Sequence, residues 1–392
     1  MTANTTRARP PLATLATATA SLTLGALPVF LLGALAVFIR QELHFGESRL
    51  GAAASLYYLS SAVMSVPGGW LAEWLGARRA IAVAAAGTAI AMAGAALLAV
   101  SWWRLVACMV LAGMANGTAL PATNLALVRG IPPARQGVAF GLKQSSGPFA
   151  TLLAGAAVPA LGLTVGWRWA FALAGVAALP LIVARRPAGT TVVGVQAANR
   201  VRTGPLVLLA CAAAAAVIGG SSLGAFFVES AVFHGMAAGT AGTLLAVGSV
   251  LGVCARVGWG WVGDNTDAGQ FAIVAGLLLC GAAGFALLGV PGTLVLVAAT
   301  VVVFCTGWAW PGVFNFAVVR RNPDAPAVAS GITGSGQFAG GIVGPLGFGA
   351  LVERTSYQVA WMSVGVCVCV AGVLVYTASR WLQRVDTRSC RR

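Results

Sequence analysis

Long apolar segments follow one another along the whole chain, and they restrict its possible folds more than any other feature. Residues 206–218 and 294–304, for example, contain no charged residue and show no period-two alternation. A chain inside lipid must form helices or a closed barrel, because its backbone groups find no water there. The unalternating runs exclude the barrel. Charged residues make up 8% of the chain, against about 25% in soluble domains. The sequence therefore predicts an all-α membrane protein.

Twelve segments are suited to cross a bilayer, which requires about 20 mainly apolar residues per helix. We predict spans at residues 17–39, 50–72, 80–100, 104–128, 137–162, 168–184, 205–229, 239–263, 270–290, 293–318, 327–351 and 357–379. The first segment follows basic residues, as the apolar part of a secretory signal would. It is long enough to span and further spans follow it, so we interpret it as a retained first helix.

The longest polar connection divides these spans into two sets of six. We predict a first half at residues 1–184, a cytoplasmic linker at 185–204 and a second half at 205–392. The two halves also share residues at near-constant offsets, which indicates two pseudo-symmetric six-helix bundles. An offset of 190 aligns Pro121 with Pro311 and Gly141 with Gly331, and an offset of 191 aligns Gly69 with Gly260 and Glu73 with Asp264.

The distribution of basic residues predicts the orientation. The net charge is +15, but the arginines are scattered at the predicted helix ends. Nucleic-acid binding needs a basic patch on one face, so we do not expect that partner. With a cytoplasmic N-terminus, 17 arginines lie on the inner side and five on the outer side. The positive-inside rule therefore predicts that both termini are cytoplasmic. The preference for arginine over lysine and the absence of long loops suggest a prokaryotic inner membrane.

The connection between the second and third spans carries the most specific motif. Its sequence is Gly-Trp-Leu-Ala-Glu-Trp-Leu-Gly-Ala-Arg-Arg at residues 69–79. This resembles the motif of the major facilitator superfamily, whose members are twelve-helix secondary transporters. The resemblance implies parallel six-helix repeats with a solute site between them. It also implies alternating access, a small-molecule solute with or without a coupled proton, and a monomer in the lipid bilayer.

The same resemblance implies two gates. In the family the motif latches the inner gate, which implies this role here for the residues Gly69, Glu73, Gly76, Arg78, Arg79 and, in the second copy, Asp264. We expect Gly69 to let two helices approach closely. The second copy, Gly260-Trp-Val-Gly-Asp264, keeps the acid but lacks the paired arginines. At the outer gate, Arg40 and Glu229 are predicted to form an ion pair, with exposed loop charges as the alternative.

Two basic side chains fall inside predicted spans. Lys143 is the only lysine among 24 basic residues, and Arg256 lies in the eighth span. At 1.5 Å per residue they stand about 10 Å and about 12 Å above the inner end of their helices. An ionisable group at such depth suggests a functional site. We predict that Lys143 and Arg256 bind an anionic group, with Gln144 donating beside them. A structural role is the alternative for each cation.

Further polar and aromatic residues lie on spans that line the central cavity in the family. The predicted solute contacts are Asn116, Asn124, Asn315, Tyr57, Tyr58, Trp310 and Gln337. Hydrogen bonding between helices is the competing interpretation. Each such bond stabilises helix association by about 0.6–2 kcal/mol.

These features together predict a secondary active transporter of a small organic anion that resembles a carboxylate. The alternative is a proton-coupled multidrug or metabolite exporter of the same fold, but spans one to six lack the buried acid that such exporters usually need. An enzyme is not expected, because His44 and His234 lie far apart near loops. No motif predicts a cofactor, a metal site or ATP use.

Overall fold

The computed structural model describes residues 11–132, 139, 142–183, 203–265, 269–322 and 326–389, and these form helices joined by short connections. In the first half the elements are α1 (Pro11–Ala34), α2 (Ala36–Leu43), α3 (Glu47–Leu75), α4 (Ala77–Leu98), α5 (Trp102–Gly130), α7 (Ser146–Ala157), the π-helix η1 (Val158–Gly162) and α8 (Trp167–Val183). In the second half they are α9 (Thr203–Phe233), α10 (Ala238–Asn265), α11 (Gln270–Leu287), α12 (Thr293–Val302), the π-helix η2 (Val303–Gly307), α13 (Pro311–Arg321), α14 (Pro326–Arg354) and α15 (Tyr357–Ser389).

The all-α prediction is confirmed. Within the described ranges, eight helical segments are long and apolar enough to cross a membrane, and two shorter apolar segments cover 146–162 and 167–183. The helices α3 and α14 have 29 residues each, but they are rich in glycine and serine and so are less apolar. They pack against each other along the middle of the molecule, which explains why a less apolar surface is tolerated there.

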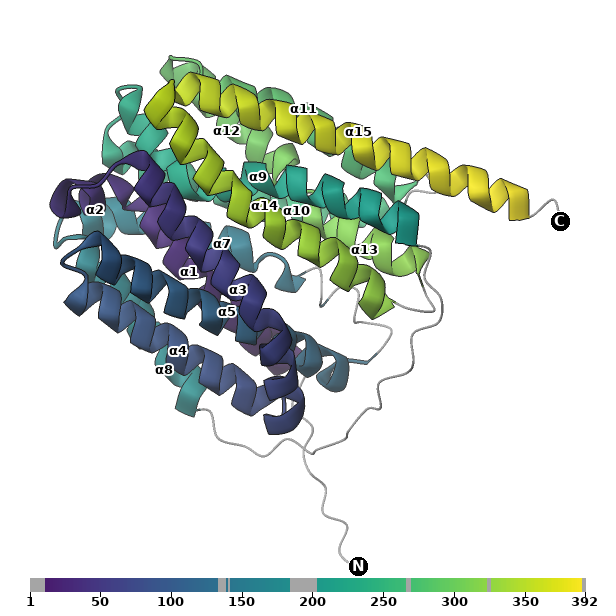
Figure 1. The fold of residues 1–392 in the computed structure, drawn as a ribbon, viewed down its shortest axis with the longest axis horizontal. Helices are drawn as coiled ribbons and strands as arrows, with labels where there is room; N and C mark the ends of the chain where they lie inside the picture. Colours follow the sequence, from purple (N-terminus) through teal and green to yellow (C-terminus); the bar gives the residue numbers. More distant parts are fainter. Residues whose placement is uncertain are drawn as a thin grey trace, which may run out of the picture.

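The helices lie in two groups (Figure 1). The purple to teal helices α1, α3, α4, α5, α7 and α8 pack together, and the teal to yellow helices from α9 to α15 form the other group. Contacts between the groups run mainly through α3 with α14, α7 with α10 and α1 with α9. The predicted linker lies almost wholly at residues 184–202, outside the described residues, so the domain boundaries stay a prediction.

Small residues bring the helix backbones together. A Cβ atom added at Gly336 of α14 would lie 2.7 Å from the carbonyl carbon of Ala210 in α9, and the same contact recurs one turn later at Gly340. Between α3 and α5, a Cβ atom at Gly68 would lie 2.7 Å from Thr118 Cα. At Gly69 it would lie 3.8 Å from Pro121 Cβ, an ordinary contact. The close approach of these helices is therefore at Gly68 and not at Gly69, because Gly68 is the residue that faces α5.

We name the two ends of the bundle by residues that lie there. The Arg40 end holds the short connections at 44–46, 99–101, 163–166, 234–237, 288–292 and 355–356. The Arg78 end, on the opposite side, holds Gly76 and the connection between α3 and α4. Gly76 has φ +81° and ψ 150° between α3 and α4. This conformation is nearly restricted to glycine, which gives Gly76 of the sequence motif a physical role in the turn.

Candidate functional site

Arg256 of α10 connects both halves of the molecule. Its Nε and Nη2 donate to the carbonyl oxygen of Trp308 at 3.2 and 2.7 Å, and its Nη1 donates to the carbonyl oxygen of Gln144. The guanidinium carbon also lies 5.2 Å from the centre of the Trp308 ring. One side chain thus bonds the start of α7 in the first half and the end of η2 in the second.

Both carbonyl oxygens are available because their helices are interrupted there. In a continuous helix the Gln144 carbonyl would accept from residue 148, which is a proline without an N–H group. Trp308 begins a turn at residues 308–310, after which α13 starts at Pro311. A buried carbonyl without a partner is costly. Arg256 therefore bonds a carbonyl oxygen at each of two helix breaks, and a proline follows within four residues of each carbonyl, at Pro148 and Pro311.

Lys143 lies directly before Gln144 and is 3% exposed. Its Nζ donates to Asn124 Oδ1 of α5. The structure thus brings Lys143, Gln144, Asn124 and Arg256 into one neighbourhood at the start of α7. The two cations have different hydrogen-bond partners there: Lys143 bonds a side chain of α5, and Arg256 bonds main-chain carbonyls. Joint binding of an anion by these two residues stays a prediction.

The polar residues predicted on the second and fourth spans bond neighbouring helices. Tyr57 is 1% exposed, and its hydroxyl donates to the Gly25 carbonyl of α1 at 2.7 Å. Asn116 Nδ2 donates to Ser61 Oγ of α3 at 3.0 Å. The Tyr58 ring lies edge-on to Tyr57, with centroids 5.3 Å apart. The hydrogen bonds of Tyr57 and Asn116 correspond to the competing interpretation, in which such groups join helices.

The residues predicted on the tenth and eleventh spans lie elsewhere. Gln337 Nε2 of α14 donates to Asn315 Oδ1 of α13 at 3.3 Å, and both side chains are half-buried. Trp310 is 1% exposed and packs edge-on against Phe314 with centroids 5.2 Å apart. The structure does not bring Trp310 to Arg256. The tryptophan beside Arg256 is Trp308, two residues earlier, because the turn after η2 directs its carbonyl and ring toward α10.

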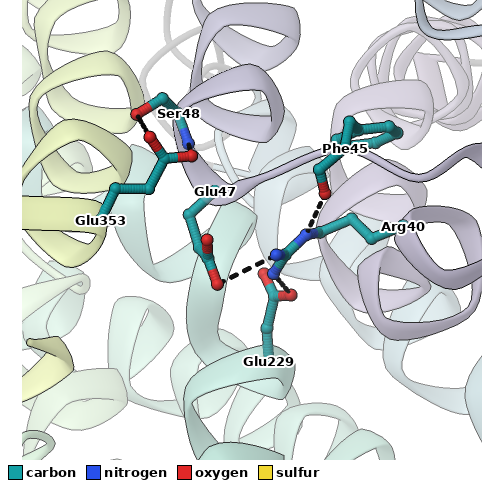
Figure 2. A network of polar contacts seen from close by, with 6 residues as sticks. All are labelled: Arg40, Phe45, Glu47, Ser48, Glu229 and Glu353. Carbon is teal, nitrogen blue, oxygen red and sulfur yellow. Dashed lines mark hydrogen bonds and ion pairs between the residues drawn. The ribbon is translucent and has the colours of Figure 1, made fainter.

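At the Arg40 end a second cluster joins the halves (Figure 2). Arg40 Nη1 of α2 forms an ion pair with Glu229 Oε1 of α9, and Nη2 bonds Glu47 Oε1 of α3 at 3.0 Å. Its Nε donates to the Phe45 carbonyl at 2.9 Å. The structure thus places Arg40 and Glu229 in contact, as the sequence predicted. Their role as a gate stays a prediction.

Glu353 forms a further link between the halves at this end. Its two carboxylate oxygens accept from Ser48 Oγ at 2.6 Å and from the Ser48 backbone N–H at 2.9 Å (Figure 2). Glu353 belongs to α14 and Ser48 to the first turn of α3, so a carboxylate of one half caps a helix of the other. These two hydrogen bonds lower the pKa of Glu353.

Within the first half, Glu42 accepts from Trp167 Nε1 and Arg168 Nη2, each at 2.6 Å. Burial acts to raise the pKa of Glu42, but the hydrogen bonds from Arg168 and Trp167 and the charge of Arg168 lower it overall. This contact fixes the end of α2 against α8. It therefore supports the position of Arg40, two residues earlier.

The predicted inner latch lies at the Arg78 end. Glu73 and Arg79 are exposed, and Arg78 is half-buried at the start of α4. The backbone of Asp264 belongs to the last turn of α10, but its side chain lies outside the described residues. The latch function of these residues stays a prediction.

Comparison with known proteins decides the family. The sequence model of the Major Facilitator Superfamily matches residues 13–345. The chain belongs to the Major Facilitator Superfamily. A crystal structure of a bacterial homolog to the human lysosomal transporter Spinster, inward-facing and unoccupied, is similar with a TM-score of 0.75 at 14% identity, covering 96% of this chain and 98% of that one. The nucleoside transporter NupG is similar with a TM-score of 0.72 at 15% identity, covering 93% and 99%.

One superfamily relative is similar in sequence. A probable sulfoacetate transporter of Cupriavidus necator is 32% identical over 150 residues, which cover 37% of this chain and 33% of that protein. The match thus spans about a third of the length of the curated relative. As a superfamily member the chain is an integral membrane transporter of a small-molecule solute, and the resemblance predicted from residues 69–79 is confirmed.

Several residues that join helices in this superfamily member were not predicted from the sequence. Trp308 is the carbonyl partner of Arg256, and Glu47, Ser48 and Glu353 belong to the contacts at the Arg40 end. A signal for Trp308 existed, because Pro311 predicts a helix break and hence a free carbonyl just before it. Glu353 and Ser48 are 305 residues apart, and no local pattern relates them.

Proposed function

We propose that the protein transports a small organic anion with a carboxylate or sulfonate group, by alternating access between its two halves. The observation that carries this proposal is the position of Arg256. It lies within a membrane-spanning helix, and the groups that it bonds in the described part of the chain are neutral carbonyls and a tryptophan ring. A guanidinium at such depth attracts a negative solute.

The number of N–H donors on Arg256 supports this role. A guanidinium has five N–H groups, and the bonds to Trp308 and Gln144 use three of them. One N–H each on Nη1 and Nη2 is then available to a solute, and this is the fork that matches a carboxylate or sulfonate. Lys143 places a second basic group one residue from Gln144. The partial similarity to a probable sulfoacetate transporter points to the same chemical class.

The contacts at the two ends support alternating access. At the Arg40 end the halves touch backbone to backbone: a Cβ atom at Gly33 would lie 2.6 Å from Ala225 Cα, and one at Gly51 would lie 2.9 Å from the carbonyl carbon of Pro345. Toward the Arg78 end, a Cβ atom at Gly331 or Gly334 would meet none of the described atoms within 4 Å. We infer a state that is closed at the Arg40 end and open toward the Arg78 end.

Orientation follows from the arginine distribution. With residues 78 and 79 on the inner side, the predicted spans assign 17 arginines to that side and five to the other, so we place the Arg78 end in the cytoplasm of a prokaryotic cell, together with both termini. The state is then inward-open. Residues 1–184 and 205–392 would be the two moving halves of a monomer, and 185–204 the cytoplasmic linker between them.

Uptake into proteoliposomes tests the substrate class. We expect the purified protein to accumulate sulfoacetate or a small carboxylate, and to reject a cationic dye. Arg256→Gln removes charge-assisted hydrogen bonds of about 1.5–3 kcal/mol, so KM should rise about 10- to 140-fold. The matched control is Arg104→Gln at an exposed position of α5, which should transport normally. Transport of the dye but of no anion would instead support the multidrug exporter and refute the proposal.

A further inference from the structure

At the Arg40 end, one guanidinium forms ion pairs with two carboxylates. Arg40 bonds Glu229 through Nη1 and Glu47 through Nη2, and both carboxylates point toward it in Figure 2. The three groups come from three different helices, and Glu229 alone belongs to the second half. The pair Arg40–Glu229 therefore joins the halves, whereas Arg40–Glu47 acts within the first half. The three groups together carry one excess negative charge when both carboxylates are ionised.

The two carboxylates differ in their surroundings. The side chain of Glu229 is 9% exposed, and that of Glu47 is 23% exposed. Oε1 of Glu229 bonds Arg40, while its Oε2 is buried and has no hydrogen-bond partner among the described residues. The hydroxyl of Tyr357 is also buried without such a partner. A buried carboxylate charge without full hydrogen bonding is costly, and a proton on that oxygen would remove the charge.

Glu229 and Tyr357 line the same pocket. It has a volume of about 330 Å³, and its lining also includes Arg40, Gln41 and Glu47. Water in this pocket can therefore deliver a proton to the Glu229 carboxylate. Once protonated, a carboxyl group can donate as well as accept. The Tyr357 hydroxyl can accept from a protonated Glu229 and donate to an ionised one, so it can serve either state of the carboxyl group.

We propose that Glu229 is a proton-binding site that controls opening at the Arg40 end. In the closed state Glu229 is ionised and holds Arg40. A proton from the pocket binds Oε2, the carboxyl group becomes neutral, and its ion pair with Arg40 is lost. Arg40 keeps Glu47 and the Phe45 carbonyl, both in the first half, so α9 is released from α2. Low pH on this side therefore favours opening.

The other groups around Glu229 do not fill this role. Glu47 shares Arg40 but lies in the same half, so its protonation leaves the link between the halves intact. Glu353 on α14 already has both oxygens bonded by Ser48. His234, at the end of α9, bonds the Ser230 carbonyl of its own helix through Nδ1.

Hydrogen–deuterium exchange of the solute-free protein in detergent tests this switch. Between about pD 7.5 and pD 5.0, exchange at residues 36–47 and 226–237, corrected for the intrinsic rate, should rise about tenfold in the wild type, the size expected for loss of a charge-assisted hydrogen bond. Glu229→Gln should show the fast exchange at both pD values. Glu47→Gln, the matched control, should keep the pD dependence of the wild type.

Two further results decide the proposal. If Glu229→Gln keeps the wild-type pD dependence, or if Glu47→Gln abolishes it, the proton site is not Glu229. If Glu229→Gln does not yield folded protein, Arg40→Gln is the second variant, and it should exchange fast at both pD values, while slow exchange would refute the proposal. No solute is present, so the outcome does not depend on whether the protein carries an anion.

Discussion

Replacing Gly33 with alanine should open the Arg40 end. Gly33 lies near the end of α1, where it packs on the backbone of α9. An added Cβ atom would lie 2.6 Å from Ala225 Cα and closer still to the Gly224 carbonyl oxygen. An ordinary contact begins at 3.4 Å, so α1 and α9 must separate by at least about 0.8 Å. Both atoms contacted belong to the backbone, so no side-chain rotation can relieve the overlap.

The size of the effect follows from the cost of overpacking. Inserting a methyl group into a packed interface costs about 1–3 kcal/mol. This cost falls on the closed state, because α1 and α9 touch here only while the Arg40 end is closed. The ratio of open to closed molecules should therefore rise by about 5- to 150-fold. Gly276→Ala on α11 is the matched control, since its Cβ atom would meet nothing within 4 Å.

Distances between spin labels measure this ratio. Labels at Gln41 and Ala237, two exposed positions beside the α2–α9 contact, can be attached in a background without the native cysteines. Gly33→Ala should add or enlarge a longer-distance population, while Gly276→Ala should match the parent. If both variants gave the parent distribution, closure at this end would not depend on the α1–α9 contact. The reasoning from helix contacts would then be refuted.

Three further outcomes are expected. Arg256→Lys keeps the charge but cannot bond two carbonyls as a fork, so it should lower the thermal stability of the purified protein by about 1–3 kcal/mol; an unchanged melting curve would contradict the bridge. Because the hydrogen bonds from Ser48 lower the pKa of Glu353 below its usual 4.5, the stabilisation from the Ser48–Glu353 contact is fully present above pH 4.5 and is lost as pH falls through the lowered pKa. Exchange at residues 47–52 should therefore accelerate only below pH 4.5 in the wild type, whereas Glu353→Gln should show no such acid-dependent step. Finally, Gly76→Ala should cost about 1–3 kcal/mol through its backbone conformation, whereas Gly69→Ala should be tolerated; equal expression and stability of the two variants would oppose this assignment.

The sequence predicted the general architecture well because hydrophobic length is a local property. In the described part of the chain, each predicted span coincides with one, two or three consecutive helical elements. The motif at residues 69–79 identified the family, and the resemblance to that family implied that Arg40 and Glu229 would meet. The contacts between helices were harder to predict from the sequence. Gly69 was expected at the close helix contact, but the rotation of α3 against α5 places Gly68 there.

The candidate site shows the same limit. Arg256 and Lys143 stood out because charges are rare in apolar spans, which is a property of composition. Their partners depend on which neighbouring helix each side chain faces, and no local sequence pattern indicates that helix. Trp308 bonds Arg256, while Trp310, two residues later, is buried against Phe314. The turn after η2 directs Trp308 and Trp310 to different neighbours, and the surrounding helices determine the orientation of that turn.

Apolar length, charge placement and helix-breaking prolines are local properties of the chain, and they determined that this protein is an all-α membrane protein with basic groups at depth. Only the tertiary structure decided which groups from distant helices meet, such as Arg256 with the carbonyls of Gln144 and Trp308, or Glu229 with Arg40. The physical reason is that hydrophobic burial acts on each segment by itself. Hydrogen bonds and close backbone contacts, in contrast, depend on the rotation and depth of two helices relative to each other.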